Sequence, residues 1–309
     1  MANKTINTKK CFKVTSIIYA SLIIVGIIMT IIAGAKLDIS FAGGTTFSYS
    51  YTGDVAEGEF TKTVSSVLKK DFNVTQNKSL EGDLQTYVVT LSGKDAIDSE
   101  TQLKITEALE KKFAKNNIEL YNADSVDASL AGTFFGKCLV AVLITAALVV
   151  IYVAIRFRKI GGVSASLAAF CALILDLLTA FFICVIFRLP IDMNFMAVVL
   201  TILGYSLNDT IVIFDRIREN RRLYPNMTIA ENVDMSVTNT MVRNIITTVT
   251  TVCAVLTIIV ISEIYGLTNL RSFAIPMVFG LVSGCFSSIF ISTPIWVWYK
   301  ERKAANGKT

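Results

Sequence analysis

Six long apolar segments dominate the pattern of hydrophobic and polar positions along the chain. They cover roughly 14–35, 136–155, 163–187, 193–214, 244–262 and 273–299. A helix needs about 20 mostly apolar residues to cross the hydrocarbon core of a bilayer, and these segments match that length. The pattern therefore predicts a polytopic α-helical membrane protein with six transmembrane helices.

A polar stretch, 36–134, separates the first two apolar segments and alternates between strand and helix patterns. Strand-forming residues are concentrated at 45–51, 73–79, 84–91 and 118–126. Apolar residues recur at helical spacing after the first of these runs and again from Ser99, where a capping-box pattern begins. The order β-α-β-β-α-β predicts an α+β ferredoxin-like domain between helices 1 and 2. Because a fold alone assigns no activity, we interpret this domain as a binding or docking module, with a purely structural cap as the alternative.

Basic residues are distributed unevenly among the segments that connect the spans. Lys and Arg cluster near both termini and after the second and fourth spans, whereas the two intervening short loops carry one each, Arg188 and Arg271. Cytoplasmic loops are typically enriched in Lys and Arg. This predicts a cytoplasmic N-terminus (1–13), helix 1 (14–35), an extracytoplasmic domain (36–134), helices 2–6 (135–299) with cytoplasmic loops 156–162 and 215–243, and a cytoplasmic C-terminus (300–309). The first apolar run is longer than a signal-peptide core, so we expect an uncleaved anchor.

Composition narrows the possible chemistry. The 309 residues are 53% hydrophobic and 17% charged, with mean hydropathy +0.59 and no histidine. This composition argues against a soluble enzyme and removes histidine-based triads, metal sites and proton shuttles. The six cysteines lie in or beside apolar runs without a CxxC motif, so we expect buried small residues rather than disulfides or metal ligands. The net charge of +5 does not indicate nucleic-acid binding, because we expect no single basic patch.

Three charged residues that lie inside a span or at its start are the candidate ion-coupling residues, because such groups are costly in a membrane. They are Asp176, Asp209 and Arg243. A supporting polar face is predicted from Tyr205, Asn208, Thr240, Asn244, Thr247 and Thr251. An Asp209–Arg243 pair could act as a switch that opens when the carboxylate is protonated, and a static pair is the alternative. Asp176 could equally serve helix packing.

Two further patterns receive structural interpretations. Gly280 and Gly284, with Ser288 one turn later, predict a close helix–helix approach. The charged run 215–219 is expected to form a solvated turn.

Four sequence runs resemble the SecD/SecF family of protein-export membrane proteins, within the resistance–nodulation–division superfamily. The run GYSLNDTIVIFDRIREN at 204–220 resembles the fourth-helix signature of the family's SecF branch. The runs NTMVRNIITTVTT at 239–251, LDISFAGGT at 37–45 and GCFSSIF at 284–290 are similar to the fifth helix, the segment after the first helix and the last helix. The resemblance extends from about residue 14 to residue 300.

The resemblance implies an accessory subunit of the Sec protein-export machinery in the bacterial inner membrane. It implies that the chain pairs with SecD, the other half of a twelve-helix assembly, and contacts the SecYEG channel, the translocating preprotein and YajC. Together they would use a proton or sodium gradient to promote late-stage translocation and release, with no covalent catalysis and no cofactor. The family's ion-pathway residues correspond to Asp209, Arg243 and Asp176. Half of a small-molecule or lipid exporter of the same superfamily and a static translocon scaffold are the alternatives.

Overall fold

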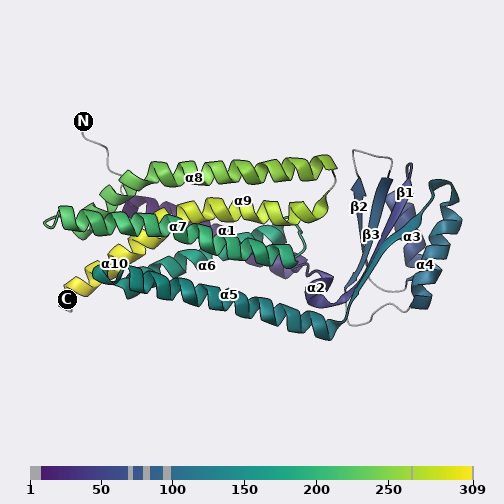
Figure 1. The fold of residues 1–309 in the computed structure, drawn as a ribbon, viewed down its shortest axis with the longest axis horizontal. Helices are drawn as coiled ribbons and strands as arrows, with labels where there is room; N and C mark the ends of the chain where they lie inside the picture. Colours follow the sequence, from purple (N-terminus) through teal and green to yellow (C-terminus); the bar gives the residue numbers. More distant parts are fainter. Residues whose placement is uncertain (1–7, 69–71, 79–83, 93–98, 266, 308–309) are drawn as a thin grey trace.

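The computed structural model describes residues 8–68, 72–78, 84–92, 99–265 and 267–307. Long helices form a bundle, and a small domain with a β-sheet lies at one end of it (Figure 1). The start of the first helix and the end of the last lie at the opposite end of the bundle.

Six helical units of the described chain are long and apolar enough to cross a membrane, which confirms the number predicted from hydropathy. They are α1 (Thr8–Ala33), α5 (Ala128–Arg156), α6 (Gly162–Ile186), α7 (Met193–Leu223), α8 (Ile229–Tyr265) and a continuous last unit. This last unit joins α9 (Thr268–Ser287), a π-helical turn η3 (Ser288–Ser292) and α10 (Thr293–Ala305). A short 3-10 helix η2 (Arg158–Ile160) connects α5 to α6.

The helices α7 and α8 are longer than the apolar pattern indicates. The segment 215–243, predicted as a loop, is helical up to Leu223 and again from Ile229, and this expectation is corrected. Hydropathy detects only the part of a helix that is apolar, whereas charged residues can continue the same helix through local pairs. On α7 such pairs join Arg218 to Asp215 and Arg216 to Glu219, both three residues apart.

The centre of the bundle is formed by α6, α7 and the last unit, with α1, α5 and α8 packed around them. In the most apolar 18 residues of the last unit 72% are buried, whereas in the most apolar 18 residues of α5 only 6% are buried. The cysteines follow this division: Cys184 and Cys285 are buried, whereas Cys171 and Cys253 are exposed, and all six are free. The expectation that the cysteines are buried is therefore wrong for Cys171 and Cys253, because they lie on outward faces of α6 and α8 that an apolar sequence alone does not distinguish from inward ones.

The small domain contains the strand and helix order predicted from the sequence. It comprises β1 (Gly44–Thr52), α3 (Glu57–Val67), β2 (Asn73–Lys78), β3 (Leu84–Ser92), α4 (Ser99–Lys112), η1 (Ala114–Asn116) and β4 (Glu119–Val126). The strands form one sheet in the order β2-β3-β1-β4, and all neighbours are antiparallel. Both α3 and α4 lie on the same side of the sheet (Figure 1).

Aromatic rings form the core between this sheet and its helices. The ring of Tyr87 stacks on Phe60 at 4.3 Å and on Tyr51 at 4.8 Å between centroids. Its hydroxyl donates a hydrogen bond of 2.8 Å to the carbonyl oxygen of Val55, and burial raises the pKa of Tyr87 above its usual value. Aromatic rings bury a large apolar area, so the domain has a hydrophobic core separate from that of the bundle.

A short helix, α2 (Ile39–Ala42), joins the two parts of the molecule. The ring of Phe41 packs on Phe134 and Phe135 of α5, with centroids 5.9 and 5.2 Å apart. Gly43 follows with φ +76°, and a Cβ there would lie 2.6 Å from the Cα of Ala128. Only glycine fits both conditions, so this junction accounts for Gly43 in the sequence.

The helices α7 and α9 approach each other closely at the small residues that the sequence singled out. A Cβ built on Gly284 would lie 3.0 Å from the Cβ of Ser206, and one on Gly280 would meet the Ile202 side chain. The hydroxyls of Thr210 and Ser288 are 2.8 Å apart in the same interface. The predicted close helix approach is confirmed.

We expect Gly284→Val to destabilise the bundle, because the added methyl groups would overlap Ser206. Overpacking of this kind typically costs about 1–3 kcal/mol. Gly204→Val is the matched control, since Gly204 lies on α7 with open space around it. Thermal unfolding of the detergent-solubilised full chain measures both, and equal midpoints for the two variants would contradict the packing argument.

Candidate functional site

Asp176 of α6 is completely buried and accepts hydrogen bonds from three serines. Its Oδ2 accepts from Ser206 Oγ of α7 at 2.7 Å and from Ser287 Oγ of α9 at 2.9 Å. Its Oδ1 accepts from Ser283 Oγ of α9 at 2.6 Å. A buried carboxylate is tolerated only when donors satisfy its oxygens, so this group fixes three helices at one point.

Tyr19 connects the first span to the same group. Its hydroxyl is 2.8 Å from Ser283 Oγ and 3.0 Å from the carbonyl oxygen of that residue. Because the Ser283 hydroxyl already donates to Asp176, Tyr19 acts as the donor here. The hydrogen bonds of Asp176 therefore extend to α1.

Asp209 lies one turn beyond Ser206 on the same side of α7, but its surroundings differ. It is 1% exposed, and its Oδ2 has no hydrogen-bond partner among the described residues. On α8, which packs against α7, Asn244 Nδ2 and Thr248 Oγ1 are also buried without a partner in that part of the chain. The interior thus contains one satisfied carboxylate, Asp176, and one with an unsatisfied oxygen, Asp209.

Arg243 is exposed on α8 and forms no hydrogen bond or ion pair with Asp209, although both residues are described. The structure does not bring these two predicted residues into contact. Of the predicted polar face, Thr240 and Asn244 are buried, Tyr205, Thr247 and Thr251 are half-buried, and Asn208 is exposed. Tyr205 and Thr251 meet across α7 and α8, with their hydroxyls 3.2 Å apart.

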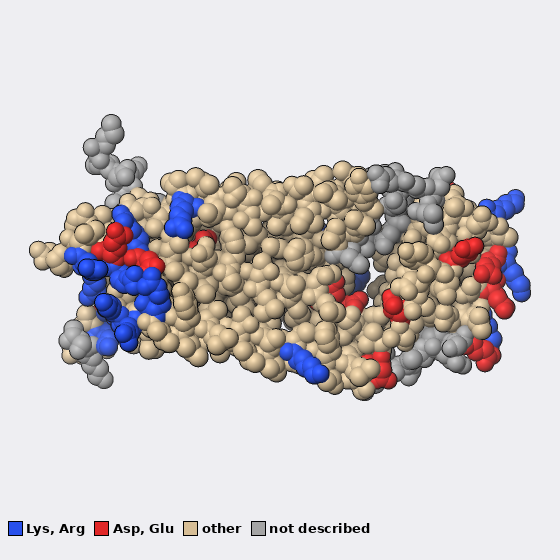
Figure 2. Space-filling model, viewed as in Figure 1, with Lys and Arg blue, Asp and Glu red and all other residues tan. Residues whose placement is uncertain are grey.

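A cavity of about 850 Å³ opens where α7, α8 and η2 come together at the end of the bundle away from the sheet. Its lining residues are Lys159, Ile160, Val212, Asp215, Arg216, Arg218, Glu219, Arg221, Arg222, Thr240 and Arg243. Figure 2 shows Lys and Arg gathered at this end, whereas the flanks of the bundle carry few charges. Basic residues also lie on the small domain, as Figure 2 shows, so they form no single patch, but those of helices far apart in the sequence gather at this end.

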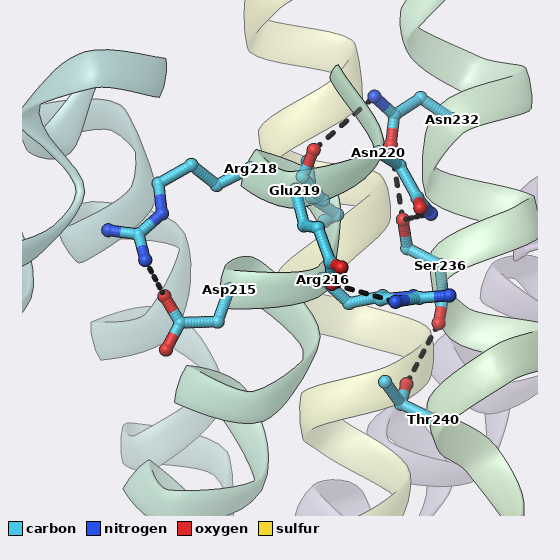
Figure 3. A network of polar contacts seen from close by, with 9 residues as sticks. Asp215, Arg216, Arg218, Glu219, Asn220, Asn232, Ser236 and Thr240 are labelled. Atoms are coloured by element: carbon cyan, nitrogen blue, oxygen red, sulfur yellow. Dashed lines mark hydrogen bonds and ion pairs between the residues drawn. The ribbon is translucent and has the colours of Figure 1, made fainter. Parts of the chain in front are cut away.

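Hydrogen bonds join α7 to α8 beside this cavity (Figure 3). Asn220 Nδ2 donates to Ser236 Oγ at 2.8 Å, and Ser236 Oγ donates to Asn232 Oδ1 at 3.1 Å. Asn220, Asn232 and Ser236 are all buried. The charged run 215–219, expected as a solvated turn, is instead helical, and side chains from it line the cavity.

Sequence reasoning missed Ser206, Ser283 and Ser287 as partners of Asp176, and Thr248 beside Asn244. The spacing of these serines indicates a shared helix face. Ser206 precedes Asp209 by three residues, and Ser283 and Ser287 are four residues apart next to Gly284. Residues three or four apart share a helix face. Which of the many serines and threonines meet a carboxylate depends on helix pairing, which the sequence does not specify.

Comparisons with known proteins identify the family. The family profile described as "Protein export membrane protein SecD/SecF, C-terminal" matches residues 105–302. The protein translocase subunit SecF of Sebaldella termitidis is 33% identical over 263 residues, which cover 85% of this chain and 81% of that protein. The corresponding subunit of Alicyclobacillus acidocaldarius is 32% identical over 290 residues, or 92% of this chain and 90% of that protein.

Longer relatives contain a matching part. The protein translocase subunit SecDF of Bacillus subtilis is 32% identical over 296 residues, which cover 91% of this chain but 36% of that protein. The crystal structure of SecDF from Thermus thermophilus, described as a translocon-associated membrane protein, has the same fold with a TM-score of 0.79 at 24% identity. The match covers 97% of this chain and 39% of that one. The chain thus belongs to the SecD/SecF family of protein-export membrane proteins.

Proposed function

We propose that the protein is an accessory subunit of the Sec export machinery that works with SecD. It uses the proton or sodium gradient to promote late-stage translocation and release of preproteins. The observation that carries this proposal is the buried Asp209 with an unsatisfied carboxylate oxygen, close to a charged cavity. A carboxylate in that setting favours binding of a proton or a cation.

The cavity gives this carboxylate a route to one side of the membrane. Val212 lines the cavity and follows Asp209 by three residues on α7, a separation of about 4.5 Å along a helix axis. Arg243 lines the same cavity from α8. We infer that water in the cavity exchanges protons with Asp209, and that Arg243 approaches the carboxylate when it is ionised.

The arrangement of the chain supports its placement in the membrane. We propose that the bundle crosses the bacterial inner membrane with both termini cytoplasmic and a ferredoxin-like domain, 36–134, on the outer side. In support, most basic residues of the helical bundle gather at its end opposite the sheet (Figure 2). Coupling would then require the outer domain to move relative to the bundle about α2 and Gly43.

SecD is the first partner that we propose. A longer relative from Bacillus subtilis carries the combined name SecDF, and this chain matches only part of it. Exposed apolar side chains on α5 and α8, among them Leu143 (67%) and Val260 (56%), leave surface for such a partner. SecYEG, the preprotein and YajC are proposed as further contacts. Half of an exporter and a static scaffold are the competing functions, and no observation favours either.

We expect Asp209→Asn to slow export of a periplasmic reporter in cells carrying only this copy. Loss of ion coupling would lower the rate by about fivefold or more, within the usual range of coupling free energies. Pulse-chase labelling measures the rate, with expression and co-purification with SecD checked in parallel.

Glu263→Gln is the matched control. It also removes one carboxylate from a spanning helix, but this side chain is 55% exposed and pairs with Arg271 at 3.2 Å. Such exposed pairs contribute little. Normal export in Asp209→Asn cells would favour the scaffold function over ion coupling.

A double-mutant cycle tests the role of Asp176. In Asp176→Asn the amide nitrogen replaces a carboxylate oxygen and cannot accept from a serine hydroxyl, which we expect to cost about 1–3 kcal/mol of stability. Adding Ser287→Ala removes one of the competing donors, so part of the loss should be recovered. Adding Ser21→Ala, at an exposed serine bonded within its own helix, should be additive. Thermal unfolding in detergent provides the readout, and additivity in both cycles would contradict the hydrogen-bonded group.

A further inference from the structure

The cavity at the end of α7 has an unusually one-sided charge. Six basic and two acidic side chains line it, a formal excess of four positive charges. Both acids are already paired: Asp215 with Arg156 and Arg218 at 2.9 Å each, and Glu219 with Arg216 at 2.7 Å. The cations of the wall therefore exceed the carboxylates available to them.

Four of the lining cations form no ion pair within the described part of the chain. They are Lys159, Arg221, Arg222 and Arg243. In addition, Nε of Arg216 is buried and has no hydrogen-bond partner among the described residues. Cations held close together repel one another, so the cavity is electrostatically complementary to an anion.

Guanidinium groups favour a particular kind of anion. Their planar array of donors matches the oxygens of phosphate, with which they form paired hydrogen bonds. The volume of about 850 Å³ is within the usual range for small-molecule sites, so it accommodates a phosphate-containing group larger than a single ion.

The position of the cavity indicates where such a phosphate comes from. Arg222 lies ten residues beyond Val212 on α7, about 15 Å along the axis, so the wall runs from the charged end into the apolar part of the bundle. Beside Arg243, the side chains of Val242 and Ile246 are 66% and 56% exposed on α8. A cationic cavity next to an exposed apolar surface matches a phospholipid, whose phosphate and acyl chains meet at the membrane boundary.

We propose that this cavity binds the phosphate headgroup of an anionic phospholipid. Lys159, Arg221 and Arg222 hold the phosphate near the mouth, and the acyl chains lie against the apolar face of α8. This site is separate from the buried carboxylates, and its occupation can be measured without export. It would place a lipid of defined charge beside the water route to Asp209.

The experiment is a lipid titration of the detergent-solubilised full chain, read by native mass spectrometry. The probes are tetraoleoyl cardiolipin and dioleoyl phosphatidylcholine, with inorganic phosphate as a competitor. We expect selective binding of cardiolipin, and a dissociation constant about thirtyfold higher in the double variant Lys159→Gln/Arg222→Gln, since each basic residue near an anionic headgroup contributes about 1 kcal/mol.

The matched control is Arg158→Gln/Arg302→Gln, which removes two positive charges from the same end of the bundle but none from the cavity. We expect this variant to bind cardiolipin as the unchanged chain does. Lys159→Arg/Arg222→Lys keeps the charge and should retain most of the binding. Equal thermal unfolding midpoints for this variant and for Lys159→Gln/Arg222→Gln would exclude misfolding as the cause of a loss.

Four outcomes would overturn the proposal. Three are equal binding of both lipids, equal losses in the cavity and control variants, and displacement of cardiolipin by co-purified SecD. The fourth is displacement of cardiolipin by millimolar inorganic phosphate, which would assign the site to a soluble phosphate instead of a lipid. Cardiolipin binding that resists phosphate and depends on Lys159 and Arg222 supports the proposal.

Discussion

A carboxylate buried among apolar helices must find hydrogen-bond donors within the protein, and the bundle is arranged around the solution that Asp176 provides. Its three donors are serines of α7 and α9, so these helices must approach α6 closely. Gly284 permits that approach where Ser206 meets α9. Since lipid offers no alternative partner, a bundle that loosens here would expose a charge or leave an oxygen unsatisfied.

Residues of α7 lie in three different environments within a few turns. On α7, Ser206 belongs to the hydrogen bonds of Asp176, Asp209 is buried with an unsatisfied oxygen, and Val212 lines the charged cavity. Positions three apart are neighbours on a helix surface, so these three environments follow one another along one side of α7. Asp209 therefore lies between the packed core on one side and the basic cavity on the other.

Much of the fold could be predicted from the sequence, because the length and spacing of apolar runs differ between membrane spans, helices and strands. The six spans follow from apolar length, and the order of strands and helices along the small domain follows from strand-forming runs that alternate with helical spacing. The ends of α7 and α8 did not follow, since a charged helix beyond the apolar part has no hydropathy signal. The site was predicted in part: Asp209 is buried as its cost implies, whereas Arg243 lines a cavity and forms no ion pair with Asp209.

The lack of an ion pair between Asp209 and Arg243 is more informative than a closed pair would have been. A closed ion pair would satisfy the carboxylate and leave it no reason to bind a proton, whereas an open one leaves a buried oxygen whose cost falls on protonation. The guanidinium, in turn, lies in a cavity where other cations repel it. Arg243 is exposed and lines the cavity, whereas Asp209 is buried, so the two residues differ in their access to water.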